Sequence, residues 1–164
     1  MPFNQNTAAG TVVYSPGEFF SGKVLANDQN LISSTDYTTV LSVTLGKYER
    51  VAFRLWLDTQ NDADGDLKWK VTTPASSSSF RARSVTPEVP ISGAVTEAVT
   101  SETTATGVAE VTAVGTDSAY YVQLEGVLQA GATAGELAVQ VAQNTSSATA
   151  TVIKAGSYLE YMKF

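Results

Sequence analysis

Apolar and polar residues alternate along most of this chain with a period of two. Between residues 48 and 58, the apolar face of the alternation consists of Val51, Phe53, Leu55 and Leu57. The opposite face carries Arg50, Arg54 and Trp56. A period of two with charged residues on one face is typical of a half-buried antiparallel strand. The pattern therefore predicts a strand with one face in a core and the other toward solvent.

The same alternation predicts further strands. They are expected at residues 37–45, 67–71, 108–114, 119–128 and 136–141. Asn, Asp and Gly make up most of residues 58–66, and these residue types favour turns because they tolerate positive φ and bond their own backbone. We therefore expect residues 48–58 and 67–71 to pair as a hairpin that stops at Pro74.

The second half of the chain predicts another hairpin and a block of closing strands. Residues 119–128 and 136–141 are joined through turn residues such as Gly131 and Gly135, so we expect them to pair. Residues 139–164 predict three short strands, separated by a Ser/Thr/Ala turn and a Gly-Ser turn. Residues 75–107 are low in complexity and lack helical periodicity, and short strands with long loops are expected there.

These patterns add up to roughly eight to ten strands without a convincing helix. An all-β, antiparallel, jelly-roll-like β-sandwich is the expected fold, because two packed sheets limit open edges. A length of 164 residues suits one domain, which we place at residues 36–164. Residues 1–35 are polar and turn-rich, and we expect an arm or first strand that contacts a partner through Phe19 and Phe20.

Charge and composition exclude several classes of function. A net charge of −6 argues against binding to nucleic acid and to anionic membranes, since both require clustered Lys and Arg. The chain has no cysteine and no histidine, which excludes thiolate nucleophiles, the usual general base and the commonest metal ligands. The first residues lack the basic and apolar runs of a signal peptide, and the apolar stretches are too short to span a bilayer. We expect no enzyme activity, cofactor or metal.

Acidic residues offer two weak alternatives. Asp58, Asp62, Asp64 and Asp66 could suggest a calcium loop. With Gly65 as the sixth position of an EF-hand, however, the twelfth position is Val71 instead of a glutamate, so a polar turn is preferred. Carboxylate pairs for a glycosidase, Asp64 with Asp66 or Glu125 with Glu136, are better explained as solvated surface.

Aromatic residues are the better candidates for a contact surface. Trp56, Trp69, Tyr48, Tyr120 and Tyr121 could form a platform for sugars, but aromatic residues also fill cores and subunit interfaces. Trp56 shares the polar face of its strand with Arg50 and Arg54, a composition typical of protein–protein hot spots. These three residues, with Phe19 and Phe20, are the predicted partner contacts.

Several segments resemble a family of tailed-bacteriophage virion proteins of the jelly-roll type. The matching motifs are Tyr48 with Phe53, Ala63-Asp-Gly-Asp-Leu-Lys68 before Pro74, Val122-Gln-Leu-Glu-Gly126, Leu137-Ala-Val-Gln-Val-Ala-Gln-Asn144 and Ala155-Gly-Ser-Tyr-Leu159. Together they cover about half of the chain, and the long Ser/Thr/Ala region 75–118 departs from the compact pattern of the family.

The resemblance implies a structural role on a virion. Such proteins associate as trimers and serve as capsid decoration (cement) proteins, head fibres or tail-fibre tips. The expected function is a decoration protein, made in the host cytoplasm, that binds the major capsid protein on the outer capsid surface as a homotrimer. The alternative is a receptor-binding tip whose partner is a host surface glycan.

Overall fold

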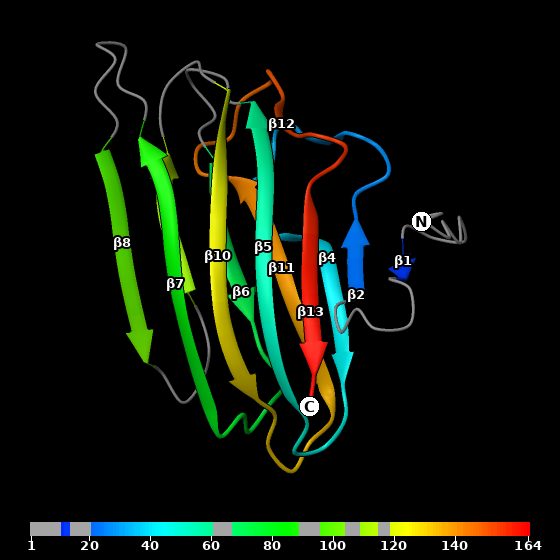
Figure 1. The fold of residues 1–164 in the computed structure, drawn as a ribbon. Coiled ribbons are helices and arrows are strands. Elements are labelled where there is room, and N and C mark those ends of the chain that lie inside the picture. Colours follow the sequence, from blue (N-terminus) through cyan, green and yellow to red (C-terminus); the bar gives the residue numbers. More distant parts are fainter. Residues whose placement is uncertain (1–10, 14–20, 61–66, 89–95, 104–108, 115–118) are drawn as a thin grey trace, which may run out of the picture.

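The computed structural model describes residues 11–13, 21–60, 67–88, 96–103, 109–114 and 119–164 (Figure 1). Within these residues there are thirteen β-strands and no helix. Three of the thirteen (β1, β3 and β12) have only three residues each, so the number of longer strands agrees with the expected eight to ten. All strand pairs in the described part of the chain are antiparallel, and the prediction of an all-β sandwich is confirmed.

The strands form a nine-stranded sheet and a four-stranded sheet that face each other (Figure 1). The larger sheet contains β1 (Thr11–Val13), β2 (Ser21–Val24), β3 (Gln29–Leu31), β5 (Arg50–Gln60), β7 (Ser79–Glu88), β8 (Thr96–Thr103), β10 (Ala119–Gln129), β12 (Thr151–Ile153) and β13 (Tyr158–Lys163). Its main order is β1-β2-β13-β5-β10-β7-β8, and β12 pairs with both β3 and β5. The smaller sheet has the order β4-β11-β6-β9 and contains β4 (Thr38–Leu45), β6 (Leu67–Thr72), β9 (Ala109–Val114) and β11 (Gly135–Gln143).

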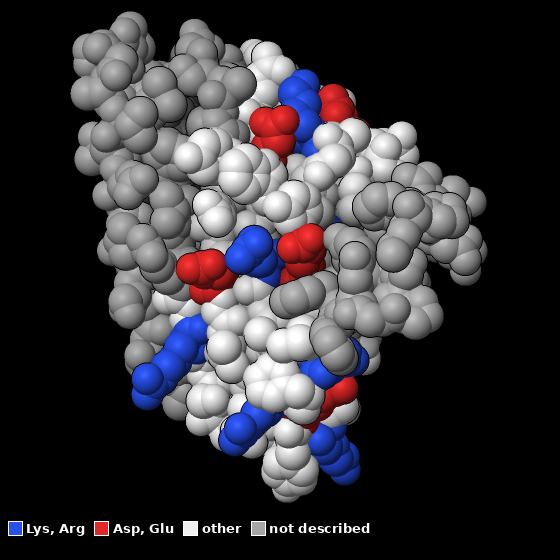
Figure 2. All heavy atoms as spheres, viewed as in Figure 1, with Lys and Arg blue, Asp and Glu red and all other residues white. Residues whose placement is uncertain are grey.

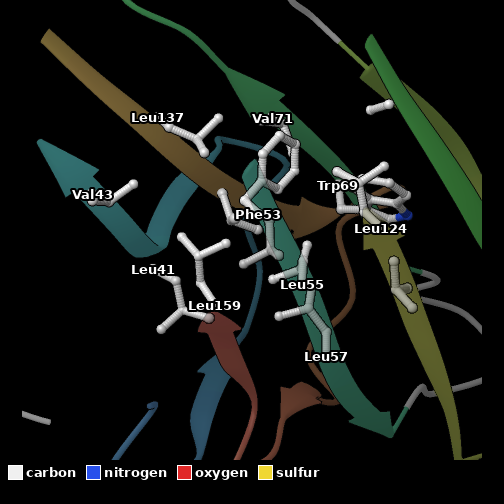
Figure 3. Packing of buried hydrophobic residues seen from close by; sticks show 14 of the residues in the cluster. Leu41, Val43, Phe53, Leu55, Leu57, Trp69, Val71, Leu124, Leu137 and Leu159 are labelled. Atoms are coloured by element: carbon white, nitrogen blue, oxygen red, sulfur yellow. The ribbon is translucent and has the colours of Figure 1, made fainter. Parts of the chain in front are cut away.

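The core lies between the two sheets and takes one face of each strand. On β5 the burial alternates residue by residue, with Val51, Phe53, Leu55 and Leu57 buried as predicted. Figure 3 shows Phe53, Leu55 and Leu57 meeting side chains of the opposite sheet, among them Trp69 of β6. Because each buried large side chain contributes roughly 1.5–3 kcal/mol, this double layer is the main stabilising element of the fold.

The predicted hairpin between residues 48–58 and 67–71 is wrong. The strands exist as β5 and β6, but β5 belongs to the nine-stranded sheet and β6 to the four-stranded sheet. Their apolar faces meet across the core instead of lying side by side in one sheet. Alternation gives the same sequence pattern in both arrangements, so it cannot distinguish a hairpin from a crossing between sheets. Residues 61–66, which connect the two strands, lie outside the described residues.

The second predicted hairpin is wrong for the same reason. β10 pairs with β5 and β7 in the larger sheet, whereas β11 pairs with β4 and β6 in the smaller one. Gly131 lies in the connection, where a Cβ atom would stand 1.5 Å from the carbonyl oxygen of Ser76. This glycine permits the close passage of two backbones as the chain crosses between sheets.

The low-complexity region is more regular than expected. Short strands and long loops were predicted for residues 75–107, but β7 spans ten residues and β8 spans eight. β7 is bonded to β10 on one side and to β8 on the other. Backbone pairing on both sides holds β7 in an extended conformation, although only Phe80 and Ala82 among its described side chains are buried.

The closing strands agree with the prediction. β11, the short β12 and β13 follow in order, and β13 lies between β2 and β5 in the larger sheet. The Gly-Ser turn precedes β13, with Gly156 at φ 92°. The hydroxyl of Ser157 donates to the carbonyl oxygen of Lys154 at 2.8 Å and accepts from the N–H of Asp58 at 3.0 Å. These bonds fix the entry of β13 against the end of β5.

β2 and β3 fall within the segment 1–35, for which an arm or a first strand was expected. β2 pairs with β1 and β13, and β3 pairs with β12, so residues 21–31 take part in the larger sheet. The boundary between an arm at residues 1–35 and a domain at residues 36–164 stays a prediction.

Candidate functional site

The outward face of β5 carries the residues predicted to contact a partner. Arg50, Arg54 and Trp56 occupy alternate positions that point away from the core, as the alternation indicated. Arg50 and Arg54 are exposed and Trp56 is half-buried. Phe19 and Phe20, the other two predicted contacts, lie outside the described residues.

β5 is flanked by β10 and β13, and the register brings side chains from all three strands into rows. Trp56 lies opposite Gln123 of β10 and Tyr158 of β13. Arg54 lies opposite Glu125 and Glu160 in the same way. Since facing residues on adjacent strands interact directly, each row acts as one unit of surface.

The first row is dominated by a pair of stacked aromatic rings. The ring centroids of Trp56 and Tyr121 are 4.4 Å apart and their planes differ by 7°. Tyr121 is in register with Asp58, so it reaches Trp56 diagonally across the strand pair. At this separation nearly parallel rings overlap, and each ring covers one face of the other. The pair therefore forms a half-buried aromatic patch on the outward face of β5 and β10.

The next row has alternating charge. Figure 2 shows one basic side chain between two acidic ones across the middle of this face, and the register identifies them as Arg54 between Glu125 and Glu160. Beside this row is a shallow hollow of about 650 Å³, lined by Ala52, Phe53, Arg54, Glu125, Gly126, Val127 and Glu160. Ala52 is the outward residue between Arg50 and Arg54, and its small side chain leaves room for the hollow.

The other aromatic candidates are separated from this face. Trp69 is fully buried in the core, and its Nε1 has no hydrogen-bond partner among the described residues. Tyr48 is 65% exposed in the turn between β4 and β5. Tyr120 lies on β10, and its side chain falls outside the described part of the structure. Of the five aromatic residues considered for a platform, the structure brings together Trp56 and Tyr121.

The acidic residues do not assemble into a site in the described part of the chain. Asp58 is exposed at the outward face of β5, while Asp62, Asp64 and Asp66 lie outside the described residues. Among the described residues, no group of three His, Cys, Asp or Glu side chains could hold a metal ion. Glu125 and Glu136 belong to strands of different sheets, so the structure separates this pair.

Among the described residues, two carboxyl groups have lowered pKa values, and both accept hydrogen bonds from backbone N–H groups. At Asp28 the hydrogen bond from the N–H of Ala155, at 2.8 Å, is the main cause of the lowered pKa. Desolvation acts to raise the pKa, and the nearby Lys154 lowers it. At Glu49 partial burial acts to raise the pKa, but the hydrogen bond from Gly46 and the ammonium of Lys163 outweigh it, so that the pKa is lowered. Both carboxylates therefore hold turns, Asp28 the turn before β13 and Glu49 the turn before β5.

Sequence reasoning identified the outward face of β5 and considered Tyr121 with Trp56 in an aromatic platform, but it did not join Glu125 or Glu160 to that face. Tyr121, Glu125 and Glu160 complete the surface, and their outward positions can be read from the two-residue alternation on β10 and β13. The sequence contains no signal for the register, because β5 pairs with β13 more than a hundred residues further along the chain.

In the described part of the chain, no helix is long and apolar enough to cross a membrane.

Comparisons with known proteins give a coarse result. No protein-family model and no curated protein matches the chain. Among solved structures, one from a study of the promiscuous specificity of carbohydrate-binding modules of the β-sandwich superfamily is similar, with a TM-score of 0.27 and 15% identity. It is matched over 88% of this chain and 59% of its own. A structure of infectious bursal disease virus, Gx strain, is similar with a TM-score of 0.20 and 6% identity, over 88% of this chain and 42% of that one.

The VP2 subviral particle of infectious bursal disease virus is similar at the same level, with a TM-score of 0.20 and 7% identity over 88% of this chain and 39% of that chain. This chain spans less than two thirds of the length of each of these structures. The structures that resemble it are thus a β-sandwich carbohydrate-binding module and viral capsid proteins. TM-scores this low carry no argument about function, which has to come from the side chains of this chain.

Proposed function

We propose that this chain is a structural virion protein without enzyme activity, which binds the outer surface of a capsid as a homotrimer and stabilises the head. The contact with the major capsid protein runs through the outward face of β5, β10 and β13. The observation that carries this assignment is the stacked pair of Trp56 and Tyr121 beside Arg54.

The chemistry of this face favours a protein partner. Trp, Tyr and Arg are the residues most enriched at binding hot spots, because they combine large apolar area with hydrogen-bonding groups. The ring stack is already ordered before binding, which lowers the entropy lost on association. The alternating row of Glu125, Arg54 and Glu160 contains one cation between two anions, a net charge of −1. Such a row fixes the register of an interface more than it adds affinity.

The mechanism is mechanical. A trimer that binds several capsid subunits at once adds contact area that must be broken together, and linked contacts bind far more tightly than single ones. The phage-like motifs in residues 121–164 support a structural role on a virion, which decoration proteins and fibre tips share.

Co-sedimentation with undecorated capsids tests the proposal. Trp56→Ala should weaken capsid binding by about 30-fold, the equivalent of about 2 kcal/mol for a hot-spot residue. The matched control is Tyr37→Ala, since Tyr37 is also half-buried but packs against Lys68 and Lys70 of the other sheet. Equal losses for both variants, or a strict monomer by light scattering at high concentration, would contradict the assignment.

A second candidate function is glycan binding, favoured by the hollow beside Arg54. A guanidinium donor and two carboxylate acceptors border an apolar floor of Ala52 and Val127, a combination that suits a ring of hydroxyl groups. Glycan-array binding that Glu125→Gln or Trp56→Ala abolishes would support this function. Absence of binding on the array, together with capsid co-sedimentation, supports decoration.

A further inference from the structure

One end of the sandwich is basic although the chain is acidic as a whole. The net charge is −6, yet Lys and Arg side chains gather at the end of the face where β13 finishes (Figure 2). Lys47, Arg50 and Arg81 are exposed there. Among the residues whose side chains the structure describes, no carboxylate forms an ion pair with any of the three. Their charge is therefore available to a partner.

Two exposed aromatic side chains lie at the same end. Tyr48 is 65% exposed and Phe164 is 61% exposed. Tyr48 directly follows Lys47, and the backbones of Phe164 and Arg50 exchange two hydrogen bonds of 3.0 and 3.3 Å. Exposed large aromatic residues that adjoin unpaired cations are unusual on a surface that only faces water.

The backbone holds Tyr48 in place. Its φ is 59°, in the left-handed region that bulky residues seldom adopt. The N–H of Tyr48 donates to the carbonyl oxygen of Gly131 at 2.9 Å. A conformation of this kind costs roughly 1–3 kcal/mol and persists only where the surrounding structure enforces it.

The enforcing structure is a clasp around Glu49. Its Oε2 accepts from the N–H of Gly46 at 2.8 Å and lies 3.1 Å from the Nζ of Lys163. Lys163 also donates to the carbonyl oxygen of Thr44 at 2.6 Å. The clasp neutralises Lys163 and Glu49 together, and it fixes the turn that presents Lys47 and Tyr48.

We propose that this basic aromatic end (Lys47, Tyr48, Arg50, Arg81 and Phe164) binds a short acidic segment of a partner protein. The identification of the partner as a protein rests on the proposed function, while the charge and the aromatic character are properties of this chain. Arginine binds carboxylates through paired hydrogen bonds, and the aromatic rings supply the apolar contact that gives affinity.

A short segment fits better than a long polyanion. Beyond the basic aromatic end, the same face carries Glu125, Glu160 and Asp58. Charges repel over about 8–10 Å at ordinary ionic strength, so a polyanion that extended along the face would meet these carboxylates. A segment confined to the end avoids them.

Fluorescence anisotropy with a short labelled oligoglutamate peptide tests the inference. Binding should be measurable at low salt and weaken as salt rises, although the protein has the same sign of net charge as the peptide. Lys47→Glu/Arg50→Glu should weaken binding at least about tenfold. Lys68→Glu/Lys70→Glu makes the same change in net charge on the outward face of β6 and should leave the affinity within about twofold.

Tyr48→Ala separates the aromatic contribution and should weaken binding about fivefold without a change in net charge. If the double variant at the basic end does not fold, Lys47→Glu alone carries the test, since Lys47 lies in an exposed turn. No binding of oligoglutamate, or equal losses for the two double variants, would overturn the inference. Tighter binding of a labelled sulfated oligosaccharide, lost in the same variants, would also overturn it and assign the surface to an anionic glycan.

This experiment is independent of the capsid assay. Capsid binding is measured through Trp56, whereas peptide binding is measured through Lys47 and Arg50. If the protein does not co-sediment with capsids but still binds the peptide, the decoration function is rejected. The assignment of the basic aromatic end as a site for acidic peptides is then retained.

Discussion

Gly126 lies directly opposite Phe53 on the neighbouring strand, and the ring of Phe53 fills the space that a side chain at position 126 would need. A Cβ atom at Gly126 would stand 2.9 Å from the ring and 2.5 Å from the carbonyl oxygen of Arg81. Phe53 in turn stacks on Phe80, with ring centroids 6.1 Å apart. The glycine is therefore part of the packing of the core between β5, β7 and β10.

We expect Gly126→Ala to destabilise the protein by about 1–3 kcal/mol, because the added methyl group meets backbone that cannot move aside. Gly22→Ala is the matched control, since a Cβ atom there has nothing within 4 Å, and it should change stability by less than about 0.5 kcal/mol. Chemical denaturation measures both. Equal unfolding midpoints for the two variants would contradict this view of the core.

The stack of Trp56 and Tyr121 should contribute to stability as a pair. A double-mutant cycle with Trp56→Ala and Tyr121→Ala is expected to give a coupling energy of about 0.5–1.5 kcal/mol. Denaturant unfolding followed by circular dichroism measures the cycle without relying on tryptophan fluorescence. Additive effects of the two substitutions would mean that the rings do not stack in solution.

Substitution of Trp69 should lower the stability of the fold far more than substitution of Trp56. Its side chain is fully buried in the core, so Trp69→Ala is expected to cost about 3–5 kcal/mol. Trp69→Phe should cost less, because it keeps most of the ring and removes the buried Nε1 that has no partner among the described residues. If Trp69→Phe proves as damaging as Trp69→Ala, a hydrogen bond donated by the Nε1–H of Trp69 is the explanation.

The clasp at Glu49 makes stability depend on pH. Partial burial acts to raise the pKa of Glu49, but the Gly46 N–H and Lys163 lower it below the ordinary value of 4.5. A carboxyl whose folded pKa lies below its unfolded pKa stabilises the fold above the unfolded value. That contribution is lost as the pH falls through the folded pKa.

Glu49→Gln should therefore reduce stability by about 1 kcal/mol or less above pH 4.5, and the difference from the unsubstituted protein should vanish at lower pH. Glu136→Gln serves as the control, because Glu136 is exposed on β11 and makes no ion pair with the described residues. Urea unfolding at a series of pH values measures both variants. A difference that persists unchanged into acid would show that the clasp is not ionic.

The sequence predicted the strands better than their partners. Alternation identified β5 with its correct inward and outward faces, and it located β6, β10, β11 and β13 within a few residues. It gave two wrong hairpins, since a crossing between sheets and a turn within one sheet have the same period of two. Gly131, which passes against Ser76, was read as a turn residue, although its role is to let two backbones approach.

Only part of the candidate surface could be predicted, because alternation records local order and not the pairing of strands. Arg50, Arg54 and Trp56 share one strand, so local periodicity was sufficient to group them. Tyr121, Glu125 and Glu160 join them through pairing between distant segments, which no local pattern records. The basic aromatic end depends on the left-handed backbone at Tyr48. A left-handed conformation is predicted from sequence where glycine or asparagine stands, and a tyrosine gives no such signal.

The placement of β13 between β2 and β5 affects how the chain folds during synthesis. β5 pairs with β13 through residues made roughly a hundred positions later, so the larger sheet cannot close while the ribosome is still producing the segment between them. Until then β5 presents an unpaired edge, the kind of feature that promotes aggregation. Contacts between such distant segments also slow folding, and this edge of β5 stays open until β13 has been made.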